Sequence, residues 1–271
     1  MLTRLGFETA ALDAKLLTGH ALGLDALALA TRENDPAGDD AASRAAALIQ
    51  RRMSGESVAR IIGEREFYGL GFGLNAATLE PRPDTELLVD MALEALPVGG
   101  RLLDLGTGTG CIPIAILANR SDANAVATDL NPDALGMARK NAERHGVSWR
   151  LDFAQGDWFG ALGPEAGAFD VITSNPPYIA SAVIDSLAPE VKAFDPMLAL
   201  DGGPDGLVPY RIIAAESLLY LKPGGQVLVE IGYDQGAAVA ALFAEQGFGP
   251  IQVHKDLNGL DRVVCAHHVR A

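Results

Sequence analysis

The sequence is poor in cysteine and in long apolar runs, and each shortage argues against a class of protein. Its 271 residues include two cysteines, Cys111 and Cys265. So few cysteines argue against a disulfide framework and predict a reducing, cytoplasmic setting. Apolar runs stay below the ~18–20 residues that span a bilayer, and the first residues contain no signal-peptide apolar segment. We therefore expect no membrane partner.

Basic residues are also scarce. The chain has 21 Lys and Arg against 35 Asp and Glu, a formal net charge of −14. This balance argues against a broad surface that neutralises DNA phosphates, so we expect no direct nucleic-acid partner and favour a protein or small-molecule substrate. The histidines show no metal-like spacing with the cysteines, and we expect no bound metal.

Apolar residues are abundant, at 49% of the chain, and their spacing divides it into three parts. Residues 1–62 show helical spacing in two stretches around a turn-rich loop at residues 34–40, which predicts a small helical domain. Residues 63–80 are aromatic and glycine-rich with partial alternation, which predicts a linking β-hairpin. We expect residues 81–271 to form the main domain.

The main domain alternates between strand-like and helix-like patterns. It opens with a helix from Leu87, for which Asp84 or Thr85 is a candidate N-cap. The alternation predicts an α/β fold with a mostly parallel sheet and helices on both faces. The last two strands are joined by a short loop and should pair as an antiparallel hairpin. The candidate strands are residues 101–105, 124–128, 149–154, 169–174, 225–231, 249–254 and 261–267, and the candidate helices are residues 110–119, 131–144, 207–220 and 235–246.

A glycine-rich turn follows the first of these strands. Its Gly-x-Gly-x-Gly spacing lets the backbone approach a ligand, and the helix after it offers free amide donors. A dinucleotide fingerprint requires Gly-x-Gly-x-x-Gly, and Cys111 stands where its third glycine would be, which argues against an NAD-dependent oxidoreductase. The turn instead resembles the first motif of S-adenosylmethionine-dependent methyltransferases. This resemblance implies cofactor contacts at Asp104, Gly106, Thr107, Gly108, Thr109 and Gly110.

Three residues further along extend the expected cofactor site. Asp129 ends the next strand, where a carboxylate can accept hydrogen bonds from both hydroxyls of a ribose. Asp157 and Trp158 follow the third strand, in a loop that lies beside the adenine in the methyltransferase class that the chain resembles. The resemblance implies that Asp157 accepts from the exocyclic amine and that Trp158 packs on the ring.

The tetrapeptide Asn175-Pro176-Pro177-Tyr178 ends the fourth strand. Its prolines remove two backbone donors, so the chain must leave the sheet there. The Asn175 side-chain oxygen and the Pro176 carbonyl can hold both hydrogens of a planar NH2 group and turn its nitrogen towards an electrophilic methyl. We expect Asn175, Pro176 and Tyr178 to act in catalysis, with Tyr178 enclosing the planar group. The whole tetrapeptide, including Pro177, should bind substrate, and Asn175 should also border the cofactor.

Six segments match one known family: residues 63–69, 81–86, 104–110, 175–178, 199–207 and 256–262. Together they resemble the HemK/PrmC family of protein-glutamine N5-methyltransferases. This resemblance implies a seven-stranded class I, Rossmann-like methyltransferase fold with an N-terminal helical bundle that recognises the substrate protein. It also implies methyl transfer from S-adenosylmethionine, with S-adenosylhomocysteine as product, to the glutamine in the Gly-Gly-Gln motif of peptide-chain release factors.

Three rival functions share some of these features. A sister enzyme methylates a glutamine of a ribosomal protein, but it carries a different segment after the Pro-Arg at residues 81–82. An adenine N6-methyltransferase presents a similar planar NH2 group, yet the chain is acidic and lacks a basic target-recognition segment. A non-catalytic binding module is disfavoured by the intact glycine turn, Asp129 and Asn175.

Overall fold

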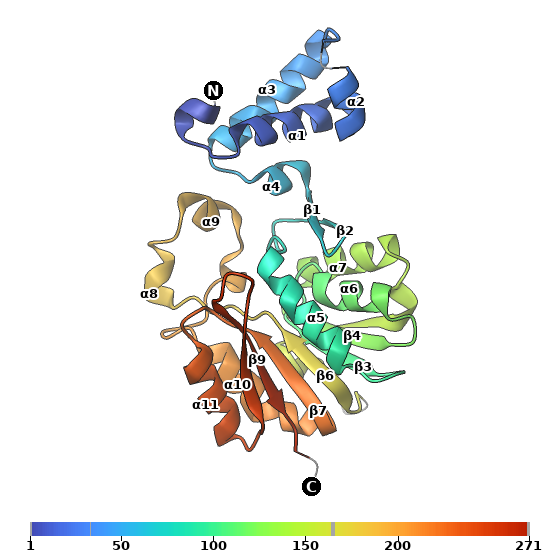
Figure 1. Cartoon of the computed structure of the whole chain (residues 1–271), viewed down its shortest axis with the longest axis vertical. Helices are drawn as coiled ribbons and strands as arrows, with labels where there is room; N and C mark the ends of the chain where they lie inside the picture. Colours follow the sequence, from blue (N-terminus) through green and yellow to red (C-terminus); the bar gives the residue numbers. More distant parts are fainter. Residues whose placement is uncertain (1, 33, 164–165, 270–271) are drawn as a thin grey trace. The chain divides into compact units, whose positions relative to one another are not determined.

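The structure, a computed structural model, describes residues 2–32, 34–163 and 166–269 (Figure 1). The chain forms two compact units. We call them the helical unit, which comprises Met1–Glu64 and Ala188–Phe194, and the sheet unit, which comprises Arg65–Leu187 and Asp195–Ala271.

The helical unit packs short helices around a small apolar core. Leu17 and Ile61 are buried in this core. At its edge the Arg52 guanidinium lies 2.6 Å from the Asp13 carboxylate and over the ring of Phe7. The elements are η1 (Leu2–Leu5), α1 (Ala10–Leu22), α2 (Ala26–Thr31), α3 (Asp39–Met53), α4 (Val58–Ile62) and, from much later in the chain, α9 (Pro189–Phe194).

The sheet unit is built on seven strands in the order β5-β4-β3-β6-β7-β9-β8. Strand β9 runs antiparallel to both its neighbours, and the remaining pairs are parallel. The predicted seven-stranded, mostly parallel sheet and its antiparallel last pair are therefore confirmed. The strands are β3 (Arg101–Leu105), β4 (Asn124–Asp129), β5 (Leu151–Gln155), β6 (Phe169–Ser174), β7 (Leu221–Glu230), β8 (Ile251–Lys255) and β9 (Asp261–His267).

Each face of the sheet has its own apolar core, because side chains alternate along every strand. In β3, Leu102 belongs to one core, and Leu103 and Leu105 belong to the other. Helices α5, α6 and α7 cover the first face, and α10 and α11 cover the second (Figure 1). These helices are α5 (Glu86–Ala95), α6 (Cys111–Asn119), α7 (Pro132–Arg144), α10 (Val208–Tyr220) and α11 (Gly236–Glu245).

Short elements complete the sheet unit. The predicted hairpin is present as β1 (Glu64–Phe67) and β2 (Leu70–Gly73), which form a separate two-stranded sheet. The sequence predicted no elements between Tyr178 and Leu207, where the structure has short helices. Such helices are stabilised by tertiary contacts and carry little periodic signal. The remaining short elements are η2 (Pro83–Thr85), η3 (Ser148–Arg150), η4 (Trp158–Ala161), α8 (Ser181–Ile184) and η5 (Met197–Ala199).

Two local predictions were wrong. The turn-rich loop ends at Gly38, because Asp39 and Asp40 already belong to α3. The expected side-chain cap of α5 is absent: Thr85 occupies the N-cap position but makes no cap hydrogen bond. The 3-10 turn of η2 runs directly into α5, so its backbone supplies a partner for the Glu86 amide and the side chain of Thr85 is free to bond elsewhere.

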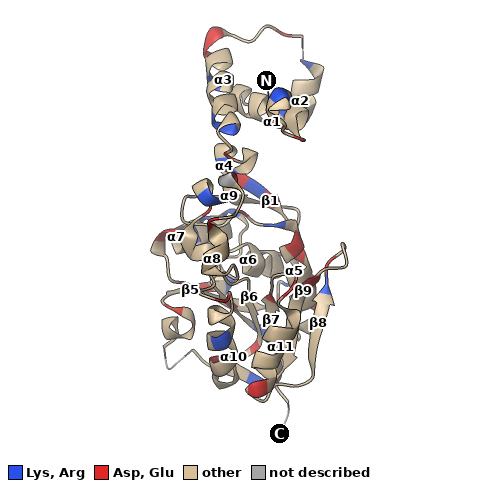
Figure 2. Ribbon diagram, turned by 90° about the vertical axis from the view of Figure 1, so that its left-hand side faces the viewer, with Lys and Arg blue, Asp and Glu red and all other residues tan. Residues whose placement is uncertain are grey.

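Charged residues are distributed over both units. Figure 2 shows short basic and acidic segments interspersed along the described ribbon. Within the described ranges, no helix is both long enough and apolar enough to cross a bilayer.

Candidate active site

A cavity of about 350 Å³ lies at the carboxyl ends of β3, β4 and β6. The chain leaves β3 in one direction to form β4 and β5, and it returns to the other side of β3 as β6. Ligands of parallel α/β sheets bind at such a reversal of strand order. The lining of the cavity comprises Ala77, Leu79, Gly106, Gly108, Thr128, Asp129, Leu130, Asn131, Gly156, Asp157, Trp158, Asn175, Pro177, Leu198, Ala199, Asp201, Gly202, Gly203, Val208 and Pro209.

The glycine turn after β3 forms one wall of the cavity. Gly106 and Gly108 line it with φ of 70° and 56°, a conformation that suits residues without a Cβ. Gly110 serves the packing of the helices instead. A Cβ there would lie 2.9 Å from the Ile114 side chain and 3.1 Å from Ala138, so this glycine lets α6 and α7 approach. The turn thus exposes backbone to the cavity at its first two glycines and packs helices at its third.

Asp129, at the end of β4, is fixed by backbone amides. Its Oδ2 accepts from the Gly108 amide at 2.9 Å, and its Oδ1 accepts from the Asn131 amide at 2.9 Å. Burial raises the pKa of this carboxyl above its ordinary value, although these amides oppose the rise. Asp129 lines the cavity. Each of its oxygens keeps a lone pair that the amides do not use, as expected for an acceptor of ribose hydroxyls.

Asp104 lies beneath the glycine turn. Its side chain is fully buried, and the Thr173 hydroxyl donates to its Oδ1 at 2.8 Å. Burial raises the pKa of Asp104 to about 7, and the charge of Asp129 adds to the rise. Asp104, Thr107, Thr109 and Gly110 are absent from the described residues that line the cavity, so the structure places these four predicted contacts behind the wall.

Asp157 and Trp158 line the cavity on the side of β5. Trp158 has a φ of 46°, unusual for a residue with a side chain. Its ring reaches to within 3.8 Å of where a Cβ of Gly106 would be. A Cβ at Gly156 would lie 2.6 Å from the Ala161 Cα, so the turn before the tryptophan requires glycine. The aromatic ring and the glycine turn thus form adjoining walls.

Asn175 follows β6 and lines the cavity with Pro177. Its side-chain Nδ2 donates to the Thr85 hydroxyl at 3.2 Å. Pro176 and Tyr178 are not among the described lining residues. Tyr178 packs against the second apolar core, and burial raises the pKa of its hydroxyl. The structure therefore brings two residues of the tetrapeptide, Asn175 and Pro177, to the cavity surface.

The opposite wall packs directly on this tetrapeptide. A Cβ at Gly202 would lie 2.8 Å from the Pro177 carbonyl oxygen and 2.9 Å from the Tyr178 Cα, so only glycine fits. The Gln235 side chain donates to the carbonyls of Tyr178 at 3.0 Å and Gly206 at 3.3 Å. These contacts give a physical reason for the glycines at residues 202–206, which in the sequence were marked only by the family resemblance.

The polar residues around the start of α5 bind different parts of the sheet unit. The Arg82 guanidinium lies 3.0 Å from the Asp195 carboxylate. Glu86 accepts from the Tyr68 amide at 2.9 Å. Thr85, between them, accepts from Asn175. This segment therefore connects the hairpin and the cavity wall to the start of α5.

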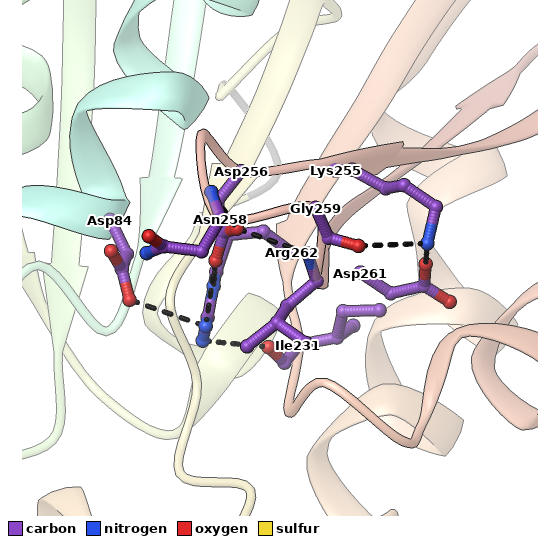
Figure 3. A network of polar contacts seen from close by, with 9 residues as sticks. Asp84, Ile231, Lys255, Asp256, Asn258, Gly259, Asp261 and Arg262 are labelled. Atoms are coloured by element: carbon purple, nitrogen blue, oxygen red, sulfur yellow. Dashed lines mark hydrogen bonds and ion pairs between the residues drawn. The ribbon is translucent and has the colours of Figure 1, made fainter.

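Arg262 joins the same segment to the loop between β8 and β9. Its guanidinium lies 3.2 Å from Asp84 and 3.1 Å from Asp256. It also donates to the Ile231 carbonyl at 3.5 Å, and Figure 3 shows these groups converging on it. The Arg262 and Asp256 side chains are 11% and 5% exposed, so water screens this pair weakly.

Glu230 and Thr85 lie close to Asn175, and neither was predicted from the sequence as a site residue. Glu230 ends β7 and is buried. Burial raises its pKa to about 7, against opposing effects of Thr85 and Arg262. A glutamate at the end of an apolar strand was the available signal, since charged residues are rarely buried without a partner. No group of His, Cys, Asp and Glu suited to a metal ion occurs in the described ranges.

Known proteins resemble this chain along most of its length. Two family models match it, "PrmC N-terminal domain" at residues 1–63 and "Methyltransferase small domain" at residues 82–191. The chain is 46% identical over 258 residues to the release factor glutamine methyltransferase of Agrobacterium fabrum, and the match covers 93% of this chain and 88% of that relative. It is 47% identical over 262 residues to the enzyme of that name from Rhodospirillum rubrum, with coverage of 96% and 80%.

A solved structure shares the fold. A methyltransferase from Pyrococcus furiosus matches with a TM-score of 0.56 and 17% identity, and the match covers 84% of this chain and 99% of that chain. At this identity the likeness concerns the fold alone.

Proposed function

Because the chain belongs to the release factor glutamine methyltransferase family, we propose that it methylates peptide-chain release factors. The methyl group passes from S-adenosylmethionine to the side-chain amide nitrogen, N5, of the glutamine in their Gly-Gly-Gln motif. The observation that carries this proposal is Asn175 in the cavity lining, with its Nδ2 bonded to Thr85. A carboxamide held by its nitrogen leaves its oxygen as an acceptor for another amide.

The walls of the cavity fit S-adenosylmethionine. Gly106 and Gly108 bring bare backbone to the ligand, Asp129 accepts from ribose hydroxyls, and Asp157 and Trp158 border the adenine. The lining combines a carboxylate, an aromatic ring and glycine backbone, as a nucleoside requires. When bound, the cofactor supplies a methyl group on a sulfonium. Asp104, Thr107, Thr109 and Gly110 support this site by holding the turn from behind.

Asn175 and Pro176 act on the substrate. An amide nitrogen is a poor nucleophile because its lone pair is delocalised into the carbonyl. The Asn175 Oδ1 and the Pro176 carbonyl hold its two hydrogens and direct the nitrogen into the cavity, so orientation supplies much of the rate. Pro177 and Tyr178 shape the surroundings of the planar group. The nitrogen directed in this way would take the methyl group that the cofactor supplies and release one of its two hydrogens as a proton to solvent.

The helical unit is proposed to recognise the release factor. Support comes from the match of residues 1–63 to the family's N-terminal domain. We propose residues 1–62 as this recognition domain, residues 63–80 as a linking hairpin and residues 81–271 as the catalytic domain. Peptide-chain release factors act in translation, so we also propose a cytoplasmic setting, with no metal and no direct nucleic-acid contact in catalysis.

Labelled S-adenosylmethionine tests the proposed substrate. The enzyme is incubated with a purified release factor and, in parallel, with the same factor carrying Gln→Ala in its Gly-Gly-Gln motif. We expect label on the first protein and none on the second. Equal label on both proteins, or label only on added ribosomal protein or DNA, would overturn the assignment.

A further inference from the structure

Glu230 is buried beside Asn175, and the proposed function gives the Glu230 carboxylate no role. It is 2% exposed and ends β7. In the sheet, Ser174 of β6 is paired with Val229 of β7, so Asn175 and Glu230 are the next residues along neighbouring strands. The Tyr210 hydroxyl donates to the Glu230 backbone oxygen at 2.8 Å and fixes the backbone there.

The Thr85 hydroxyl connects these two side chains. It accepts from the Asn175 Nδ2 at 3.2 Å. Thr85 and Asn175 lie close enough to the Glu230 carboxyl to lower its pKa, and its Oε2 has no hydrogen-bond partner within the described residues. Thr85 is 2% exposed, so water does not compete for its hydroxyl.

The chemistry of the three groups gives this chain a direction. An ionised carboxylate can only accept hydrogen bonds. Thr85 therefore donates its single hydroxyl hydrogen to Glu230, and its oxygen lone pairs remain for the Asn175 Nδ2. The amine end of the Asn175 carboxamide is thus held by Thr85, and its Oδ1 is directed away from Thr85.

We propose that Glu230 is a positioning residue that acts through Thr85 to fix the orientation of the Asn175 carboxamide. In this orientation Oδ1, and not Nδ2, meets the substrate amide. The inference rests on the proposed function, because only an NH2 substrate needs an acceptor at this point. A flipped Asn175 would present one donor to another and leave the substrate nitrogen undirected.

Charged and titratable groups surround Glu230 from five parts of the fold: Asp84 of η2, Cys111 of α6, Tyr178 after β6, Tyr210 of α10 and Arg262 of β9. Burial is the largest influence and raises the pKa of Glu230 to about 7. A protonated Glu230 gains a hydrogen that it can donate to Thr85. The Thr85 hydrogen is then free to be donated to the Oδ1 of a flipped Asn175 carboxamide. The rate of methyl transfer should therefore fall as the pH drops through about 7.

Glu230→Gln tests this role, because it keeps the size of the side chain and removes the acceptor-only carboxylate. We expect kcat on the release factor to fall about 10²-fold, as a misdirected reacting group does, with an unchanged KM for S-adenosylmethionine. The decline of kcat on the acid side should be present in the wild type and absent from the variant. Glu245→Gln makes the same chemical change at an exposed position of α11 and should behave as the wild type.

Thr85 provides a second pair of variants in case Glu230→Gln does not fold. Thr85→Val removes the hydroxyl at constant shape, and its kcat should fall by as much as that of Glu230→Gln. Thr85→Ser keeps the hydroxyl and should recover most of that loss. Thermal unfolding of each variant checks that the fold is retained.

The outcomes separate the two proposals. A Glu230→Gln variant with the kcat of the wild type, or with the same acid-side decline, would overturn the positioning role while leaving the methyltransferase function intact. Equal rates for Thr85→Val and Thr85→Ser would overturn it too. A wild type that leaves the release factor unmethylated would overturn both.

Discussion

At the scale of the residue, the cavity depends on side chains that the protein already holds in place. Asp129 accepts from a backbone amide with each oxygen. Asn175 is held through its nitrogen. Groups fixed in this way lose little freedom when a ligand binds, so their hydrogen bonds to the ligand retain more of their energy.

Asp129→Asn should weaken cofactor binding. The substitution replaces a carboxylate oxygen with an NH2 group that cannot accept from the Gly108 or Asn131 amide or from a ribose hydroxyl. A hydrogen bond to a charged group contributes about 1.5–3 kcal/mol, so Kd for S-adenosylmethionine should rise roughly 10- to 100-fold in calorimetry. Asp152→Asn, on the exposed side of β5, is the matched control and should leave Kd unchanged. Equal Kd values for the two variants would refute the ribose role.

At the scale of the element, the site is formed by strand ends and by the loops that pack against them. The strand ends were predictable from the sequence, because apolar runs, the glycine turn and the double proline each mark where β3, β4 and β6 finish. The residues that hold these strand ends in place were not predictable. Thr85, Glu230 and Gln235 lie 90, 55 and 60 residues from Asn175 in sequence, and no periodicity reports a contact over such separations.

The same limit explains the wrong helix cap. Thr85 before Glu86 has the composition of an N-terminal cap, and sequence rules respond to composition. In the fold the 3-10 turn replaces the cap, and Asn175 competes successfully for the hydroxyl. Local preference gave way to a tertiary contact at the cavity wall, and such conflicts concentrate at functional sites.

Gly202→Ala should distort the tetrapeptide turn. The added Cβ would meet two backbone atoms, the Pro177 oxygen at 2.8 Å and the Tyr178 Cα at 2.9 Å, and backbone cannot rotate away. We expect kcat to fall about 10²-fold through misplacement of Asn175.

The control for this prediction is Gly136→Ala in α7. A Cβ there has open space around it. Alanine should therefore raise the free energy of unfolding by up to ~1 kcal/mol without changing kcat. A Gly202→Ala variant that is as active as Gly136→Ala would show that the wall does not brace the turn.

At the scale of the whole molecule, the chain divides into two units with separate cores. It passes between them after residues 64, 187 and 194, so α9 belongs to the helical unit although its neighbours in sequence do not. In the sheet unit, burial raises the pKa of the Asp104 and Glu230 carboxyls to about 7. These two groups make its stability depend on pH.

Asp104→Asn should flatten this pH dependence. The folded state favours protonated Asp104. The stability that this preference contributes is fully present below the unfolded pKa of about 3.9 and is lost as pH rises through about 7. Between those values Asp104 lowers the free energy of unfolding by up to ~1.4 kcal/mol per pH unit.

Denaturant unfolding at about pH 5 and about pH 7 checks this. The wild type should lose more stability than Asp104→Asn over that interval. Equal losses would mean that Asp104 is already ionised in the folded protein at the lower pH.

The most direct test of the central claim compares the wild type with Asn175→Ala on one release factor, with the product analysed by peptide mass spectrometry. We expect the wild type to add a single methyl group to the side-chain nitrogen of the Gly-Gly-Gln glutamine. Asn175→Ala should add none and still bind S-adenosylmethionine, because the alanine removes the acceptor for the substrate and leaves the cofactor walls in place. Methylation of that glutamine by Asn175→Ala at a near wild-type rate would contradict the account.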